Sequence, residues 1–101
     1  LTPTELPYQA NIYALKQIGV DRVVTVSAVG SLHEHLPPRT PVLPDQIIDR
    51  TVSRPRSFFG DGSVAHIGIA DPFCGQLSGP IAAASVMAGR PVARGGTYIC
   101  I

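Results

Sequence analysis

Apolar residues near the start of the chain recur at the spacing of a helix. Pro7 suits the first position of a helix, where its missing N–H group leaves no bond unmade. Gly19 occupies the place where a left-handed cap is expected. The pattern predicts a helix from Pro7 to Ile18. The apolar positions that carry it are Tyr8, Ile12, Leu15 and Ile18.

A nearly continuous apolar run follows at Arg22–Ala28, and most of its residues are β-branched. Such a run is typical of a strand that is buried on both faces, in a parallel or mixed sheet covered by helices. A helix, a short loop and a buried strand make one half of an α/β layer. The first thirty residues therefore predict an α/β protein.

The middle of the chain alternates between loops and short extended pieces. Leu36–Pro44 carries four prolines and predicts a loop. A short strand is expected around Val42–Ile48, with Pro44 marking an edge or a bulge because proline cannot donate to a sheet. Ser63–Ala70 alternates weakly between apolar and polar residues and suggests another strand.

A second helix is expected over Gln76–Ala88. Asp71 is a candidate N-cap and Pro72 a candidate first residue for the turn that leads into this helix. Gly79-Pro80 weakens its beginning, and Gly89 closes it. The sequence thus predicts two helices with extended segments between and after them.

The chain ends on Thr97–Ile101, which is predicted to be a strand after the turn Gly95-Gly96. A strand needs partners or solvent for its backbone groups on both sides, so it is an unusual place for a chain to stop. The first residue, moreover, is Leu1 and not methionine. We therefore expect residues 1–101 to be the central part of a single larger domain, with parts absent at both ends.

The composition argues against several classes of protein. The 101 residues carry 8 basic and 7 acidic side chains, a net charge of +1, so no basic face is available for nucleic acid or an anionic membrane. A hydrophobic content of 45% and a mean hydropathy of +0.21 argue against a disordered segment. No apolar run approaches the roughly 18 residues of a membrane-spanning helix.

The two cysteines, Cys74 and Cys100, do not form the dense framework of small secreted domains. They are interpreted as core thiols in a reducing compartment. Leu1–Pro7 has no basic region and holds two prolines, which is unlike a secretory signal. These features predict a cytoplasmic protein.

Small residues follow the first predicted strand at Ser27-Ala28-Val29-Gly30. Ligands of open α/β sheets bind at the carboxyl ends of strands, and Gly30 would let a ligand approach the backbone closely. The stretch lacks the spacing of a phosphate loop before a helix. From the pattern alone, both a ligand cradle and an ordinary strand-to-loop turn stay open.

The other polar residues are better explained by structural roles than by metal binding or catalysis. His33-Glu34-His35 lacks the third and fourth partners of a metal site, so a solvated loop is expected and no metal. Asp45, Asp49 and Asp71 could act as acids or bases, but Asp71 is better explained as a cap and Asp49 as the partner of Arg50.

His66 lies among apolar neighbours, where a core or interface role is commoner than catalysis. Neither cysteine has the setting of a catalytic thiol. The residues alone therefore define an α/β domain with a candidate small-ligand site.

Several stretches taken together resemble the methylthioadenosine phosphorylase branch of the purine nucleoside phosphorylases, in that family's order and approximate spacing. The resemblance covers nearly the whole chain and implies a mixed β-sheet with flanking helices. It also implies a homotrimer with sites near subunit boundaries. The stretches are Tyr8–Lys16, Ser27–Leu32, Pro44–Thr51, Arg54–Phe59, His66, Ala70–Cys74 and Gly95–Tyr98.

The resemblance implies a pentosyl transfer without a cofactor, in which inorganic phosphate is the co-substrate and a purine nucleoside is cleaved. Ser27 and Ala28 match the pair that binds phosphate through a hydroxyl and a backbone N–H, with Ser27 replacing the commoner threonine. Val29 and Gly30 match the stretch beside ribose and base. His66 matches a histidine that reaches a neighbouring subunit's pocket for the 5′ substituent. Cys74 matches a position with a structural role.

The purine-protonating acid of the family would lie beyond Ile101, so the catalytic residue is not assigned within these 101 residues. 5′-Methylthioadenosine is the expected substrate. A phosphorylase for methylthioinosine, inosine or guanosine, and a non-catalytic truncated domain, remain as alternatives. The 101 residues alone are expected to be inactive.

Overall fold

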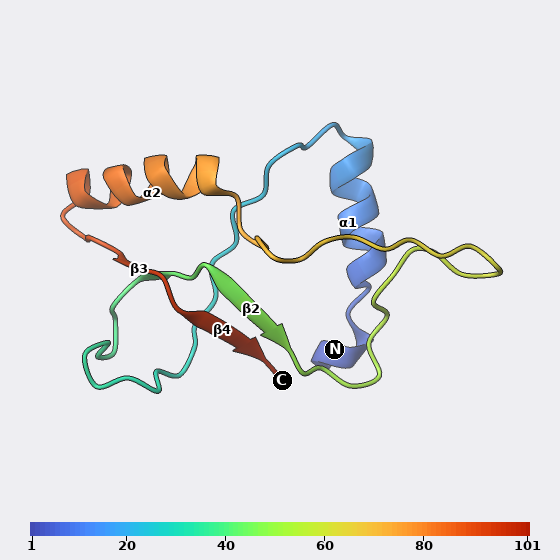
Figure 1. The fold of residues 1–101 in the computed structure, drawn as a ribbon, viewed down its shortest axis with the longest axis horizontal. Helices are drawn as coiled ribbons and strands as arrows, with labels where there is room; N and C mark the ends of the chain where they lie inside the picture. The colour runs from blue at the N-terminus through green and yellow to red at the C-terminus, as the bar shows by residue number, and fades with distance from the viewer. The chain divides into compact units, whose positions relative to one another are not determined.

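The structure is a computed structural model that describes residues 1–101, and it consists of short elements joined by long loops (Figure 1). Two compact units are formed, one from Leu1–Ala28 with Thr51–His66 and the other from Val29–Arg50 with Ile67–Ile101. The elements in chain order are η1 (Pro3–Glu5), α1 (Tyr8–Gln17), β1 (Val42–Leu43), β2 (Gln46–Asp49), α2 (Gly75–Met87), β3 (Ala93–Arg94) and β4 (Thr97–Cys100).

Helix α1 confirms the helix expected from the spacing of apolar residues. It begins at Tyr8, directly after Pro7, and ends at Gln17. Gly19 adopts a φ of +84° and donates its N–H to the carbonyl of Lys16 at 3.1 Å. The predicted left-handed cap is therefore present, and glycine suits it because it carries no Cβ to clash.

The short 3₁₀ helix η1 is held by a reciprocal bond at its start. The N–H of Thr2 donates to the Glu5 carboxylate at 2.6 Å. Hydrogen bonds from the backbone and the side chain of Thr2 stabilise the charged carboxylate, and they lower the pKa of Glu5 below its ordinary value. This is the arrangement of a capping box, in which the first and last residues of a turn satisfy each other.

The strand predicted at Arg22–Ala28 is wrong. The segment is irregular, and no backbone hydrogen bond joins it to another segment. Val23, Val24 and Val26 are 52, 63 and 96% exposed, so it is not buried on either face. A strand exists only through a partner's N–H and C=O groups, and residues 1–101 supply none here.

The strand suggested at Ser63–Ala70 is also wrong. This stretch is irregular as well, and every residue in it is exposed. It follows a turn in which the N–H of Ser63 donates to the carbonyl of Gly60 at 2.9 Å. Weak alternation without a pairing partner does not make a strand.

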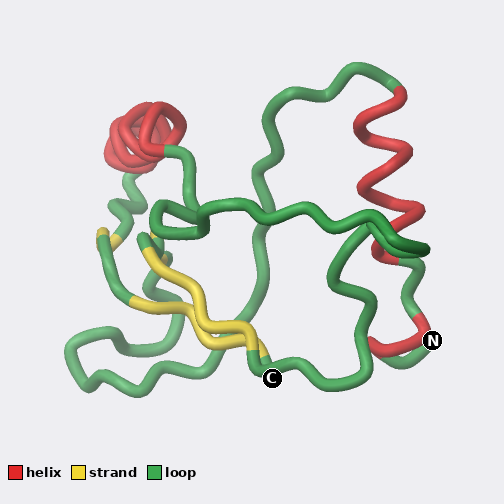
Figure 2. Tube along the Cα trace, turned by 45° about the vertical axis from the view of Figure 1, so that its right-hand side comes forward, coloured by secondary structure: helices red, strands yellow, loops and turns green.

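The strands of the second unit pair in parallel, β1 with β3 and β2 with β4 (Figure 2). The strand expected around Val42–Ile48 is confirmed, including its interruption at Pro44. The final strand is confirmed as β4. Helices together with parallel strands confirm the α/β class.

Helix α2 confirms the second predicted helix, but its beginning differs. Asp71 is not its cap, because the backbone of Cys74 is still extended, with φ −73° and ψ 108°, and helical geometry begins at Gly75. Cys74 is therefore the N-cap, and its carbonyl accepts the N–H groups of Leu77 and Ser78 at 3.1 Å each. Pro80 lies inside the helix.

No apolar side chain in the structure is buried, and Thr51, at 7% exposure, is the single buried residue. Cys100 is half-buried, whereas Cys74 is exposed at the start of α2, so the interpretation of both cysteines as core thiols is wrong for Cys74. Both thiols are free. Neither helix has the length and apolar character to cross a membrane.

Candidate functional site

The four residues expected to hold phosphate and nucleoside lie in an open, irregular stretch. Ser27 and Ala28 are exposed, and so are Val29, at 60%, and Gly30. A Cβ built on Gly30 meets no atom within 4 Å. Ser27 and Ala28 are therefore open to solvent, and their assignment to phosphate stays a prediction.

A cavity of about 510 Å³ lies in the loop that directly follows Gly30. The Ser31 hydroxyl donates to the carbonyl of His33 at 2.9 Å and accepts the N–H of His33 at 3.2 Å, which folds the loop onto itself. The rings of His33 and His35 are 5.1 Å apart at a tilted angle. No three potential metal ligands gather here or elsewhere in residues 1–101. The cavity is lined by Ser31, Leu32, His33, Glu34, Leu36, Pro37 and Pro38.

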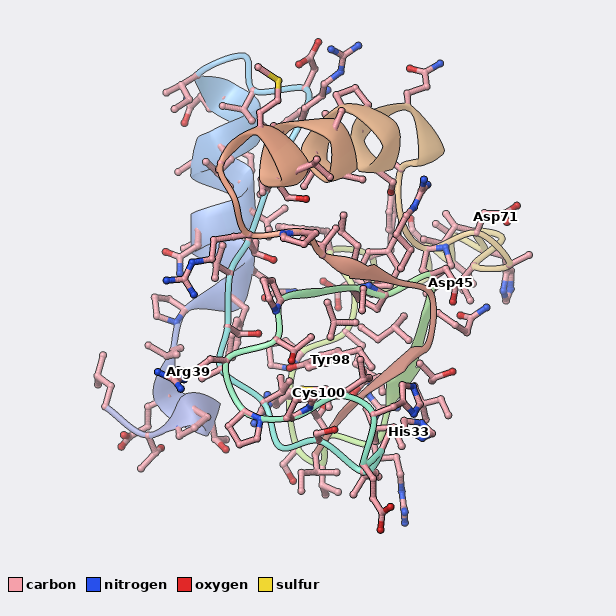
Figure 3. The ribbon with its side chains drawn as sticks, turned by 90° about the vertical axis from the view of Figure 1, so that its left-hand side faces the viewer. His33, Arg39, Asp45, Asp71, Tyr98 and Cys100 are labelled. Atoms are coloured by element: carbon pink, nitrogen blue, oxygen red, sulfur yellow. The ribbon has the colours of Figure 1, made fainter.

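A second cavity, of about 410 Å³, lies where β1 and β3 end and α2 begins. Asp45 and Asp71 both line it, and Figure 3 shows Asp71 in the loop that precedes α2. The sequence singled out these two aspartates but gave no signal for Arg94, which belongs to a segment far from both of them in the chain. The full lining is Leu43, Pro44, Asp45, Asp71, Phe73, Gly75, Ser78, Arg94 and Gly95.

Asp45 has a structural role at the edge of this cavity. Both strand pairs break at the same level, at Pro44-Asp45 in one strand and Gly95-Gly96 in the other; we call this the paired break. The carbonyl of Gly96 accepts two consecutive N–H groups, from Asp45 at 3.1 Å and Gln46 at 3.3 Å. Consecutive N–H groups of a regular strand point to opposite sides, so the ladder changes phase here.

The change of phase leaves the N–H of Gly96 without a backbone acceptor, and the Asp45 carboxylate accepts it at 3.1 Å. Gly95 and Gly96 have φ of +86° and +105°, which disfavours any residue with a Cβ. A Cβ on Gly95 would also lie 3.4 Å from Oδ2 of Asp45. The Gly-Gly pair and the carboxylate thus fit each other, which gives Asp45 a structural role that the sequence did not assign to it.

We expect Asp45→Ala to lower the free energy of unfolding by about 0.5–1.5 kcal/mol, because water can replace the lost acceptor at this exposed position. Asp45→Asn keeps an acceptor oxygen and should lose less. Urea unfolding of the full-length protein carrying this segment measures both. Equal losses for the two variants would contradict the proposed role of the acceptor.

His66 is the last residue of the segment Thr51–His66, which belongs to the same unit as α1, and it is exposed, so the alternative of a core histidine is wrong. The beginning of this segment, residues 51–57, forms a compact loop. The Arg56 guanidinium donates to the carbonyl of buried Thr51. Ser53 has a φ of +59°, an uncommon value for a serine.

Two residues of α1 contact this 51–57 loop. The side-chain amide of Gln9 donates to the carbonyl of Ser57. The Arg54 guanidinium carbon lies 5.7 Å from the centre of the Tyr8 ring, within the range of a cation–π interaction. Tyr8, Gln9 and Arg54 are all half-buried. Sequence reasoning missed these contacts, because they join residues far apart in the chain.

Known proteins resemble this chain along its whole length. It is 55% identical over 102 residues to S-methyl-5'-thioadenosine phosphorylase of Geobacter sulfurreducens, covering 100% of this chain and 36% of that protein. It is 50% identical over 101 residues to the protein of the same name from Koribacter versatilis, covering 100% of this chain and 35% of the relative. The chain therefore spans about a third of the length of these curated relatives.

A solved structure is similar as well. Methylthioadenosine phosphorylase from Schistosoma mansoni, in complex with tubercidin, matches with a TM-score of 0.89 and 28% identity, over 98% of this chain and 42% of that one. Residues 2–101 also match the sequence profile of the phosphorylase superfamily. From this match over almost the entire chain, we conclude that it belongs to the phosphorylase superfamily.

Proposed function

We propose that the full-length protein carrying this chain is a pentosyltransferase that cleaves 5′-methylthioadenosine with phosphate, giving adenine and 5-methylthioribose 1-phosphate. The observation that carries the proposal is the 55% identity, over the whole chain, to a relative of that name. The exposure of Ser27–Gly30 is compatible with the proposed binding of phosphate and nucleoside at this stretch. Phosphate is the co-substrate, and no cofactor is needed.

In the proposed reaction a phosphate oxygen attacks the anomeric carbon of the sugar while the bond from that carbon to the purine breaks. The purine leaves with the electron pair and takes up a proton from an acid. Ser27 and Ala28 donate hydrogen bonds to the phosphate and hold it beside the sugar, which lowers the entropic part of the barrier. Anionic phosphate also stabilises the positive charge that develops on the sugar.

Val29 and Gly30 are proposed to lie along the ribose and the base, where the open space around the backbone of Gly30 gives the nucleoside room. His66 is proposed to reach the pocket for the 5′ substituent in a neighbouring subunit of a homotrimer. Its exposure supports a contact outside its own unit. Two free cysteines suit a reducing compartment, and the cytoplasm is the proposed location.

The activity is tested by incubating the purified full-length protein with methylthioadenosine, with and without phosphate, and measuring free adenine. We expect adenine release that depends on phosphate. Methylthioinosine, inosine and guanosine serve as competing substrates. Preferential cleavage of one of these would favour a 6-oxopurine phosphorylase, and cleavage of none would favour a non-catalytic domain.

The isolated 101-residue chain should release no adenine above background, because the proton donor for the purine is expected outside it. The same assay at matched concentration measures this. Adenine release by the isolated chain would contradict the assignment of that acid beyond Ile101.

A further inference from the structure

The segment that carries His66 is tied to the first unit near its beginning and not near its end. After Ser57, its hydrogen bonds are local: the N–H of Phe59 donates to the Ser57 hydroxyl at 3.0 Å, and the N–H of Ser63 to the carbonyl of Gly60 at 2.9 Å. Neither bond fixes the segment against α1. That anchorage comes from the 51–57 loop, through Gln9 and through the Arg54 and Tyr8 pair.

We propose that Arg54 and Tyr8 form a clasp that positions the His66 segment, which makes Arg54 a positioning residue for recognition of the nucleoside's 5′ substituent. The inference rests on the proposed function, since it takes His66 as the residue that meets this substituent. Arg54 does not touch substrate in this scheme. It acts by holding the segment's beginning against α1.

The chemistry of the clasp favours arginine and an aromatic ring. A planar guanidinium lies flat over a ring face and is attracted by its negative quadrupole. Both side chains are half-buried, where this attraction is less screened than at an exposed site. The ring face makes the contact, so the phenol hydroxyl of Tyr8 is not required. Tyr8→Phe therefore keeps the clasp, and Tyr8→Leu removes it.

Kinetics of the full-length protein test the proposal. Arg54→Ala and Tyr8→Leu should each raise the KM for methylthioadenosine about fivefold. The KM for phosphate should not change. The ratio of kcat/KM for methylthioadenosine to kcat/KM for adenosine should fall. Adenosine lacks the methylthio group, so its binding should depend less on His66. Combining the two substitutions should add little to either one, since both remove the same contact.

Tyr8→Phe is the matched control and should keep the wild-type preference. Thermal unfolding of each variant shows whether it is folded. Arg54→Ala with an unchanged preference for methylthioadenosine would overturn the proposal. An equal fall in activity toward both nucleosides, with a lower melting temperature, would also overturn it in favour of a purely structural role.

Amide hydrogen exchange gives a readout that does not depend on activity. Exchange over residues 57–66 should accelerate in Arg54→Ala and Tyr8→Leu and stay at the wild-type rate in Tyr8→Phe. If the wild-type protein cleaves no nucleoside, the proposed function fails, and the exchange data still decide the clasp. Equal exchange in all variants would overturn the clasp even in an active enzyme.

Discussion

Replacing Ser27 with alanine in the full-length protein is expected to raise the KM for phosphate by about 10- to 100-fold. A hydrogen bond to a charged partner contributes about 1.5–3 kcal/mol, and phosphate carries its charge into the proposed bond with the Ser27 hydroxyl. The KM for the nucleoside should change less, because that hydroxyl is proposed to face the anion. Initial rates at varied phosphate, with saturating methylthioadenosine, measure the effect.

Two further variants sharpen this test. Ser27→Thr keeps a hydroxyl at the same position and should retain most of the phosphate affinity. Ser63→Ala removes an exposed hydroxyl from a turn whose hydrogen bond to Gly60 uses only the backbone, so it should leave the kinetics unchanged. A wild-type phosphate KM in Ser27→Ala would remove this residue from the site.

Pro80→Ala is expected to stabilise the protein by about 2 kcal/mol. Proline inside a helix lacks the N–H that would bond to the carbonyl of Gln76, and it costs about 3 kcal/mol relative to alanine. About 1 kcal/mol of this gain is lost again, because proline also restricts the unfolded chain. Pro80 is exposed, so the smaller side chain leaves no cavity.

In a protein of more than 150 residues, a gain of that size raises the melting temperature by about 4–8 °C, which calorimetry of the full-length protein would detect. Gly79→Ala is the companion variant, because a Cβ there meets no atom within 4 Å. It should stabilise by up to about 1 kcal/mol. A lower melting temperature for Pro80→Ala would show that the proline ring makes contacts that outweigh the missing bond.

The parts of the fold that were predicted correctly are those fixed by neighbouring residues. The spacing of Tyr8 to Ile18 and the cap at Gly19 specify α1 locally. Pro44 predicts the break between β1 and β2, and Gly95-Gly96 predicts the turn before β4. Each of these signals acts within a few residues, so the sequence pattern is sufficient.

The errors concern features that depend on distant partners. Arg22–Ala28 has the composition of a buried strand, but composition supplies no neighbouring strand and no covering helix. Asp71-Pro72 has the chemistry of a helix start, yet the backbone stays extended through Cys74.

The candidate site shows the same division. The pattern of small residues drew attention to Ser27–Gly30, and the family resemblance gave it a role in binding phosphate and nucleoside, which stays a prediction. The contact of Tyr8 with Arg54 and the cavity around Arg94 come from segments whose meeting no local pattern encodes.

The paired break has a consequence for how the gene can change. Val42 pairs with Ala93 and Gln46 with Thr97, so the offset of 51 residues seen between Asp45 and Gly96 holds on both sides of the break. A one-codon insertion at only one side of the paired break, either Pro44-Asp45 or Gly95-Gly96, would turn every later side chain of that strand to the opposite face. Insertions and deletions should therefore be tolerated at these two sites only in compensating pairs, which makes two distant stretches of the gene a single unit of variation.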